Sequence, residues 1–477
     1  MPERLDAVVI GSGPNGLAAA LELARNGASV LVLEAADTIG GGTRTAELTL
    51  PGYHHDVCSA AHPLGILSPY LSTLPLAEHG LTWIQPPASV AHPLDGEPAV
   101  ILRKSMDATA GSLGADAAAY RRLIGPLLHH PHELIAEILG PAHLPRHPLQ
   151  LARFGVPALL PATVLGHRWF RGERARALLA GCAAHSALPL TRPISAAVGL
   201  LFLLTGHVET WPIAQGGSAA ISSALGAYLI SLGGRIETAR PVHALADLPP
   251  SRIVLFDTGP DQVASIASPV LPSRYVRRLR RYRFGPGIFK IDWALDGPIP
   301  WTDPACLDAA TVHVGGTLDE IASSEAAVWR GEHPDRPYAI VVQPSLFDPS
   351  RAPAGKHTGW AYCHVPAGSI VDRTDVLERQ VERFAPGFRD RILARHVMRT
   401  ADVEAYNANY VGGAITGGVT DLGQLFTRPV ARADPYSTPN PDVFICSAST
   451  PPGGGVHGMC GYHAARTAQR RLAAAAV

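Results

Sequence analysis

The first 34 residues carry a pattern of apolar and polar positions that predicts a β-strand, a helix and a second β-strand. The run from Ala7 to Ile10 is apolar and rich in β-branched residues, as in a buried parallel strand. A helix of small apolar residues follows and ends at Asn26-Gly27, which is typical of a left-handed helix stop. The next apolar run, from Ser29 to Leu33, predicts the second strand. This segment therefore predicts one βαβ unit of a parallel sheet.

The pattern changes twice further along the chain. From Met106 to Gly206 it is apolar and helical but is interrupted by nine prolines, which predicts short helices in a lid or in the wall of a substrate domain. After this region the strand and helix rhythm returns, with a helix that stops at Gly233-Gly234, a strand toward Val242 and a strand from Arg252 to Phe256. We therefore expect a discontinuous nucleotide domain.

A second sheet is predicted in the later half of the chain. Alternation in the predicted β stretch from Arg283 to Leu295 places Lys290 and Asp292 on one face of a strand. The full assignment is Phe289, Ile291, Trp293 and Leu295 on one face and Ile288, Lys290, Asp292 and Ala294 on the other. Lys290 has two interpretations: it lies on a solvated face paired with Asp292, or it lies over a cofactor. Further strands are expected at Thr311–Val314, Tyr338–Gln343 and His357–Val365, with helices beside them.

Three glycines connect the first predicted strand to its helix. Gly11, Gly13 and Gly16 form the pattern Gly-x-Gly-x-x-Gly, in which glycines allow a tight turn, close approach of a pyrophosphate and close packing of helix on sheet. The helix N-terminus offers free N–H groups to phosphate oxygens. Glu34 ends the second strand, 18 residues after the last glycine, where a carboxylate binds a ribose hydroxyl. An ordinary βαβ unit with a glycine-rich turn would leave Glu34 unexplained, so we predict dinucleotide binding.

The residues after Glu34 indicate which dinucleotide is bound. Gly40 to Gly42 form a flexible turn, and Thr43 and Arg44 follow it. Arginine offers forked donors that stay charged, which suits a second approach to the same pyrophosphate. A glycine doublet and an arginine after the ribose acid resemble the flavoprotein pattern, so FAD fits better than NAD.

A second glycine-rich segment lies near the C-terminus. A strand from Val443 to Cys446 leads into Gly453 to Gly455, and a helix is expected from about Gly458. Its positive end would stabilise the negative charge that a reduced flavin carries at N1 and O2. Since the two glycine-rich segments lie at opposite ends of the sequence, one long ligand that contacts both is the economical explanation.

Together, these segments resemble a known family. The N-terminal unit, the run GGRIETARPV and the motif TPPGGGVHGMCGYHAA are similar to the FAD-dependent phytoene desaturase and flavin amine oxidase superfamily. The nearest branch is the phytoene-dehydrogenase-like one that includes the pyridine nucleotide-disulphide oxidoreductase domain 2 proteins. The resemblance implies FAD phosphates at the first glycine loop, ribose at Glu34, pyrophosphate at Arg44, adenine at the Val242 backbone and isoalloxazine near the C-terminal motif. The implied cofactor-binding residues are Gly11, Ser12, Gly13, Pro14, Asn15, Gly16, Glu34, Ala35, Gly41, Gly42, Thr43, Arg44, Val242, Ser447, Val456, His457, Gly458 and Met459.

In that family the cofactor carries the chemistry, while the protein holds a C–H bond over flavin N5 and excludes water. The stretch from Asn407 to Gly418 resembles the family segment near the flavin on the substrate side. His457 is the candidate for proton handling, with a polar plug of no chemical role as the alternative. Lys290 loosely resembles the strand lysine that holds a water near N5 in amine oxidases of the superfamily.

Length and this resemblance together predict the domain organisation. At 477 residues the chain exceeds one hydrophobic core, so we expect two domains. The predicted fold class is α/β, with a Rossmann-type FAD-binding domain and a discontinuous α+β substrate domain that combines a mixed or antiparallel sheet with helices. The FAD-binding domain is expected in residues 1–65, 213–268 and 425–477, and the substrate-binding domain with its helical lid in residues 66–212 and 269–424.

The charge balance and the cysteine and histidine patterns limit the ligands, partners and cellular location that we expect. Forty basic and forty acidic residues cancel, so no nucleic acid partner is expected. The six cysteines lack CxxC spacing, which predicts free buried thiols in a reducing cytosol, and the histidine-rich stretch near His54, His55 and His62 fits no zinc pattern, so no metal is expected. No basic and apolar leader precedes the first strand, and we expect a cytoplasmic location.

Three functions remain open. The first is an FAD-dependent oxidoreductase that desaturates or isomerises an apolar, isoprenoid-like small molecule. The second is an amine oxidase that uses oxygen, and the third is a flavin-binding chaperone or interaction protein without turnover. The most apolar run, Ala196 to Thr205, is too short to cross a bilayer; it is expected to be a core helix, with a surface that lies peripherally on a membrane as the alternative.

Overall fold

The computed structural model describes residues 4–141 and 144–474, and its first layer is a five-stranded sheet. Its neighbouring strands all run parallel. In sheet order the strands are β16 (Val443–Ile445), β10 (Ser251–Phe256), β1 (Leu5–Ile10), β2 (Val30–Leu33) and β9 (Arg235–Glu237). Three distant parts of the chain therefore build one parallel sheet, which confirms the predicted Rossmann-type layer.

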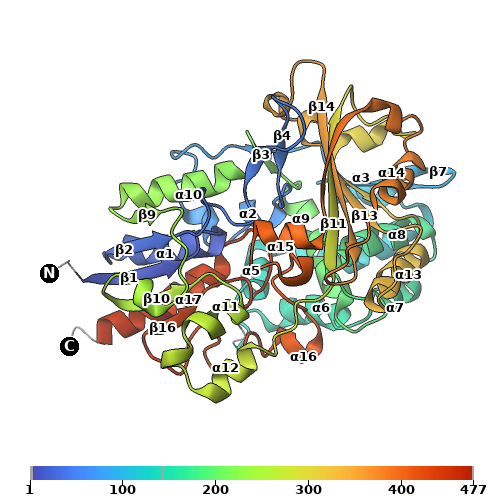
Figure 1. Ribbon diagram of the computed structural model, residues 1–477. Helices are drawn as coiled ribbons and strands as arrows, with labels where there is room; N and C mark the ends of the chain where they lie inside the picture. The colour runs from blue at the N-terminus through green and yellow to red at the C-terminus, as the bar shows by residue number, and fades with distance from the viewer. Residues whose placement is uncertain (1–3, 142–143, 475–477) are drawn as a thin grey trace.

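Helices cover both faces of this sheet (Figure 1). One face carries α1 (Pro14–Arg25), α10 (Ala219–Ser231) and α17 (Met459–Ala474), and the other carries α11 (Pro260–Ile266) and α12 (Ser273–Leu279). Pro14 lies in the first turn of α1, where its missing N–H costs no hydrogen bond. Small side chains predominate from Asn15 to Ala24 and are buried, which lets α1 pack against both α10 and α17.

The second layer is a seven-stranded mixed sheet. In order its strands are β15 (Ile392–Met398), β11 (Gly287–Leu295), β14 (His357–Val365), β13 (Ala339–Val342), β12 (Ala309–Val314), β6 (Ala88–Leu94) and β7 (Glu97–Leu102). Neighbours are antiparallel except β12 and β6, which run parallel. Two short antiparallel pairs are β3 (Thr45–Glu47) with β4 (His54–Asp56) and β5 (Trp83–Ile84) with β8 (Ile213–Ala214).

Short helices fill the proline-interrupted stretch, as predicted. They are α3 (Met106–Gly111), α4 (Ala117–Ile124), α5 (Pro131–Ile138), α6 (Pro148–Ala158), α7 (Ala162–Trp169), α8 (Glu173–Ala184) and α9 (Ser195–Val208). Pro131 and Pro148 lie in first turns, where a helix tolerates proline. Other helices are α2 (Pro63–Ile66), α13 (Leu318–Trp329), α14 (Thr374–Glu382), α15 (Thr400–Tyr406) and α16 (Leu422–Leu425).

Helix α9 contains the most apolar run of the chain and is mostly buried against α8 and the seven-stranded sheet. The prediction of a core helix is therefore confirmed. Within the described residues no single helix has the length and apolar composition needed to cross a bilayer, and α6 and α7 meet that test only jointly, across a 99° bend.

The predicted strand toward Val242 is wrong beyond its first residues, because β9 ends at Glu237. The following segment leaves the sheet: the Ala239 N–H donates to the Ala36 carbonyl at 2.8 Å, in a backbone conformation with φ +51°. Pro241 then has no N–H to continue a ladder. Val242 consequently lies in an irregular segment that passes the end of β2.

Candidate functional site

The carboxyl ends of β1, β2, β10 and β16 meet at one edge of the parallel sheet, which we call the cofactor edge, and the glycine loop lies there. The Gly16 N–H donates to Asp257 Oδ2 at 2.9 Å, which joins the start of α1 to the end of β10. A Cβ atom on Gly13 would lie 2.7 Å from the same oxygen, and one on Gly16 would collide with the Gly11 carbonyl oxygen. Only glycine therefore fits at these two positions.

Asp257 is a member of the site whose role the sequence did not indicate. Burial raises the pKa of its carboxyl to about 8, the Gly16 and Gly13 N–H groups oppose that shift, and the nearby Glu34 carboxylate adds to it. Asp257 is therefore largely protonated and uncharged near neutral pH, so it adds little negative charge where a phosphate would bind. The sequence did contain one indication of its position in the site, because Asp257 directly follows a predicted parallel strand.

Glu34 is held by four donors at the end of β2. The Ser12 N–H and hydroxyl donate to Oε2 at 2.9 and 2.6 Å, and the Ala36 N–H donates to Oε1 at 2.9 Å. Arg44 Nη2 also donates to Oε1 at 3.3 Å, and its guanidinium lies 5.5 Å from the Tyr406 ring centre. The structure thus pairs Arg44 with the predicted ribose carboxylate; its contact with a pyrophosphate stays a prediction.

The second glycine turn lies against the first loop. The Gly40 N–H donates to the Ser12 carbonyl at 3.0 Å, and a Cβ atom on Gly41 would lie 3.0 Å from Gly13 Cα. The Tyr406 hydroxyl donates to the Gly41 carbonyl at 2.6 Å. The two predicted approaches to one pyrophosphate are therefore adjacent in space, with α15 covering them.

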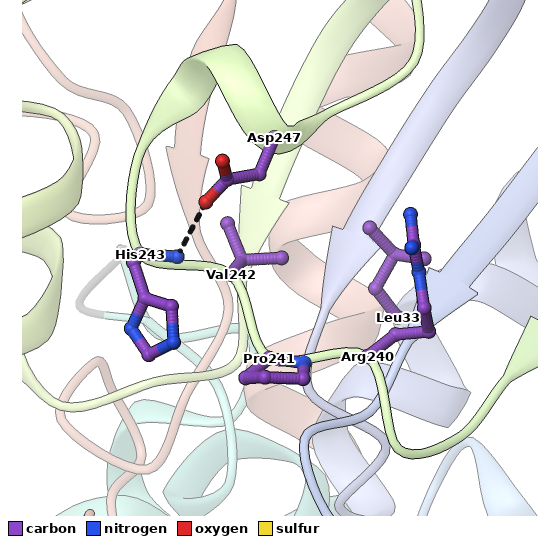
Figure 2. Close-up of a pocket in the computed structure, with 6 residues that line it drawn as sticks. All are labelled: Leu33, Arg240, Pro241, Val242, His243 and Asp247. Carbon is purple, nitrogen blue, oxygen red and sulfur yellow. Dashed lines mark hydrogen bonds between the residues drawn. The ribbon is translucent and has the colours of Figure 1, made fainter.

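A cavity of about 310 Å³ opens beside the end of β2, as Figure 2 shows. Val242 lines this cavity together with Leu33, the last residue of β2. Arg240, Pro241, His243 and Asp247 complete the lining. Because Glu34 follows Leu33 directly, the cavity lies next to the predicted ribose site, where an adenine ring would be expected.

The two ends of the chain meet where α17 crosses α1. A Cβ atom on Gly461 would collide with the Asn15 carbonyl oxygen, and one on Gly458 would lie 3.0 Å from Ala18 Cβ. The C-terminal glycine turn is therefore adjacent to the start of α1. A single ligand can contact both the N-terminal glycine loop and the C-terminal glycine turn only if the two lie side by side, as they do here.

His457 is fully buried in this turn. Its carbonyl accepts from the Ser68 hydroxyl at 2.6 Å, and its Nδ1 accepts from the Met459 N–H at 3.0 Å. Burial lowers the pKa of His457 to about 4, so its ring is neutral near pH 7. Ser447 lies between β16 and the turn, and its hydroxyl is 2.7 Å from that of Ser449. A role of His457 in proton handling stays a prediction.

Arg428 is a buried cation that the sequence did not single out. Its Nη2 donates to the carbonyls of Gly417 and Ala448 at 2.9 and 2.8 Å and to the Tyr282 hydroxyl at 2.8 Å. Nε donates to the Ser449 carbonyl at 3.2 Å. Across the described residues no carboxylate forms an ion pair with it. Arg428 therefore ties the stretch from Asn407 to Gly418 to the C-terminal turn and leaves its positive charge uncompensated.

Lys290 is buried on β11 and forms an ion pair. Its Nζ lies 2.5 Å from both Asp292 oxygens and 5.2 Å from the Trp360 ring centre. Burial alone would raise the pKa of Asp292, but Lys290, His396 and His55 lower it below its usual value. The predicted pairing is confirmed, but the solvated face is wrong, because His55 of the β3–β4 hairpin lies 3.6 Å from Asp292.

Cys58 and Tyr410 lie between Lys290 and the second glycine turn. Burial raises the pKa of the Cys58 thiol, against opposing effects of Tyr410 and Lys290. Cys58 Sγ lies 3.6 Å from the Tyr410 hydroxyl, which would be 2.5 Å from a Cβ atom on Gly42. The chain therefore places the Lys290 pair on the side of the cofactor edge that faces the second sheet. In the part of the chain described, no group of three or more acidic, histidine or cysteine side chains could hold a metal ion.

Comparisons with known proteins agree with this geometry. A family model described as an NAD(P)-binding Rossmann-like domain matches residues 9–71. The chain is 27% identical to pyridine nucleotide-disulfide oxidoreductase domain-containing protein 2 of Rattus norvegicus, over 98% of this chain and 94% of that protein. A shorter match, 48% identical, joins 14% of this chain to 10% of the all-trans-retinol 13,14-reductase of Danio rerio.

Solved structures share the whole fold. A putrescine oxidase bound to putrescine is similar with a TM-score of 0.64 and 17% identity over 99% of both chains. A cyclohexylamine oxidase from Brevibacterium oxydans is similar with a TM-score of 0.59 and 17% identity over 100% of both chains. The chain is therefore similar over nearly its whole length to the pyridine nucleotide-disulfide oxidoreductase domain-containing protein 2, and it shares the fold of these two amine oxidases.

The cofactor edge fits a dinucleotide such as FAD. Asn15 Oδ1 and Thr258 Oγ1 are buried there without a hydrogen-bond partner among the described residues. The glycine loop leaves no room for side chains, and a cavity adjoins the acid that would hold a ribose. The protein therefore leaves both space and hydrogen-bonding capacity for a ligand along this edge.

Proposed function

We propose that this oxidoreductase binds FAD along the cofactor edge and removes a hydride from a substrate C–H bond. The observation that carries the proposal is the crossing of α1 and α17 at Asn15 and Gly461, which joins the two glycine-rich segments at one sheet edge. A nicotinamide cofactor would need only the first of these segments. When bound, FAD supplies a hydride acceptor at N5.

The chain's own residues bind and orient the cofactor. The N–H groups at the start of α1 would bind the pyrophosphate, Glu34 a ribose and the segment at Val242 the adenine. Uncharged Asp257 spares the phosphates a like-charge repulsion. The turn that contains His457 would support the isoalloxazine, and the buried His457 side chain would keep water away from the reacting carbon.

We further propose an apolar, isoprenoid-like substrate that is desaturated or isomerised. Helices α8 and α9 present mainly apolar side chains to the inner face of the seven-stranded sheet, the face that also carries Lys290. The local similarity to a protein named for retinol supports this substrate class. Lys290, paired with Asp292, would position groups at the cofactor side of that space.

A second candidate is an amine oxidase that uses oxygen. It is favoured by the similarity in fold to putrescine oxidase and cyclohexylamine oxidase and by a buried lysine on β11. Hydrogen peroxide release on addition of amines would support it. Peroxide-free reduction of the flavin by polyenes would support the isoprenoid-like substrate instead.

We also propose that α6 contacts a membrane surface, which would deliver an apolar substrate. Leu149 and Val156 on this helix and Leu159 just after it are 79%, 69% and 54% exposed. Arg153 lies between them in the sequence and would contact anionic headgroups. Sedimentation with anionic vesicles should be lost in L149E/V156E and kept in I230E, a matched change at an exposed apolar residue of α10. Absence of vesicle binding by the unmodified protein would contradict the contact.

The absorption spectrum of the purified protein tests the main proposal. We expect flavin bands, and bleaching under anaerobic conditions when a suitable polyene or amine is added. A flavin that no candidate substrate reduces would support an FAD-binding protein without turnover. A colourless protein that takes up no added FAD would overturn the proposal.

A further inference from the structure

A second cavity lies on the nucleotide domain, away from the cofactor edge. It has a volume of about 230 Å³ and adjoins α12, at the bottom of Figure 1. Its lining residues are Pro272, Arg274, Tyr275, Arg278, Arg432 and Pro439. None of them is among the residues expected to contact FAD, so the cavity is a separate feature of the molecule.

Two of its arginines come from one face of α12. Arg274 and Arg278 lie four residues apart, so their side chains project from the same side of the helix. Both are exposed, and within the described residues neither forms a hydrogen bond or an ion pair with another side chain. No acidic residue occurs between Asp261 and Asp292, so nothing nearby in the sequence offsets their mutual repulsion. A bound anion would remove that cost.

The third arginine comes from a segment outside α12. Arg432 Nε donates to the Ser437 hydroxyl and Nη2 donates to the Thr438 carbonyl, both at 3.2 Å. Its guanidinium lies 6.0 Å from the centre of the Tyr275 ring. One cationic group is therefore held at the cavity before any ligand binds, which lowers the entropic cost of binding.

Tyr275 supplies a donor with no partner. The residue is 6% exposed, and its buried hydroxyl makes no hydrogen bond with any described residue. Burial raises the pKa of Tyr275 to about 12, so the phenol keeps its proton. A buried donor left without an acceptor is unfavourable, and an anion in the cavity would accept its hydrogen bond. Tyr275, Val276 and Leu279 pack into the core under the parallel sheet, which makes the wall rigid.

We infer that this cavity binds the phosphate group of a small phosphorylated ligand. Guanidinium groups on two walls and a phenol O–H match the several acceptor oxygens of a phosphate, which arginine binds through paired donors. The same chemistry could be met by a soluble phosphate ester or by a phospholipid headgroup. Both sources use the same donors, and vesicles distinguish them.

The test uses the full chain saturated with FAD, so that the cofactor edge is occupied. Titration calorimetry with inorganic phosphate and with pyrophosphate should detect binding, and R274Q/R278Q should weaken it about tenfold or more, as expected for lost charged hydrogen bonds. R277Q/R281Q is the matched control, because it removes the same charge from residues that do not line the cavity. The control should change affinity by less than about threefold, as expected for screened surface charges.

Y275F isolates the buried hydroxyl and should weaken phosphate binding several-fold without loss of bound FAD. Sedimentation with phosphatidylcholine vesicles that contain phosphatidic acid is measured in the L149E/V156E background, which removes the contact proposed for α6. It would identify a lipid source if the remaining binding is lost on addition of R274Q/R278Q and kept on addition of R277Q/R281Q. The inference is overturned if neither phosphate, pyrophosphate nor these vesicles bind. It is equally overturned if R277Q/R281Q weakens binding as much as R274Q/R278Q, because binding would then follow overall charge and not the cavity.

Discussion

The substitution Asp257→Asn tests the electrostatics of the cofactor edge. Burial raises the pKa of Asp257 from an ordinary 3.8 to about 8, so the folded protein keeps a proton that the unfolded chain releases at much lower pH. Each pKa unit corresponds to about 1.4 kcal/mol, so ionising this carboxyl in the folded state costs at most about 6 kcal/mol. Asparagine has nearly the same shape and stays neutral, and its carbonyl oxygen can still accept from the Gly16 N–H.

The sign of the pH dependence follows from linkage. Between about pH 4 and pH 8 the folded protein binds more protons at this site than the unfolded chain does, so Asp257 makes the free energy of unfolding fall as pH rises. The asparagine variant lacks this contribution. The free energy of unfolding of the variant, minus that of the unmodified protein, should therefore increase from pH 4 to pH 8 and level off above it.

Melting temperatures of both proteins, measured at intervals from pH 5 to pH 9, provide the assay. Asp335→Asn is the matched control, because Asp335 is exposed, and its offset from the unmodified protein should not vary with pH. A constant difference between Asp257→Asn and the unmodified protein over this range would refute the reasoning. It would mean that Asp257 is ionised in the folded protein, with its charge accommodated by the glycine loop.

Three further substitutions or conditions probe the rest of the site. Lys290→Met leaves buried Asp292 without its cation and should lower the free energy of unfolding by about 3–5 kcal/mol, most of which K290M/D292N should recover in thermal melts. Gly461→Ala pushes a methyl group into the backbone of α1 and should lower both the melting temperature and the FAD content, whereas Gly155→Ala, with open space on α6, should change neither. Six buried histidines have lowered pKa values in the folded state: about 4 for His55, His62, His92, His207 and His457, and about 3 for His185. The free energy of unfolding should therefore fall as pH falls from about 6.5 toward 4. A melting temperature that stays constant over this range would contradict the prediction.

The parallel-sheet layer was predictable because its signals are local. The strand, glycine loop and helix from Leu5 to Arg25 are contiguous, and each element follows from a run of a dozen residues or fewer. Strand β14 occupies the residues predicted for it, His357–Val365. The prediction made strand β9 too long, since the sequence pattern near Val242 does not indicate the turn after which this segment passes the end of β2.

The contacts that define the substrate side could not be read from the sequence, because each joins segments far apart in it. Strand β6 pairs with β12 across more than 200 residues, and no periodicity specifies that register. His55 reaches Asp292 only because the β3–β4 hairpin folds over β11, which turned an expected solvated face into a buried one. Arg428 belongs to no recognisable motif, since most of its partners are backbone carbonyls, which every residue possesses.

The distribution of charge along the cofactor edge explains why the site suits an anionic ligand. At the glycine loop the buried acid Asp257 is largely neutral, and the Glu34 carboxylate is occupied by four donors. At the other end Arg428 is 1% exposed and is held by carbonyl groups, with no carboxylate paired to it in the described chain. A buried unpaired cation is costly unless a ligand brings the opposite charge. Phosphates at the glycine loop would meet little negative charge from the protein, and a flavin that gains negative charge on reduction would lie near the cation Arg428. A neutral ligand of the same length would gain nothing from either feature.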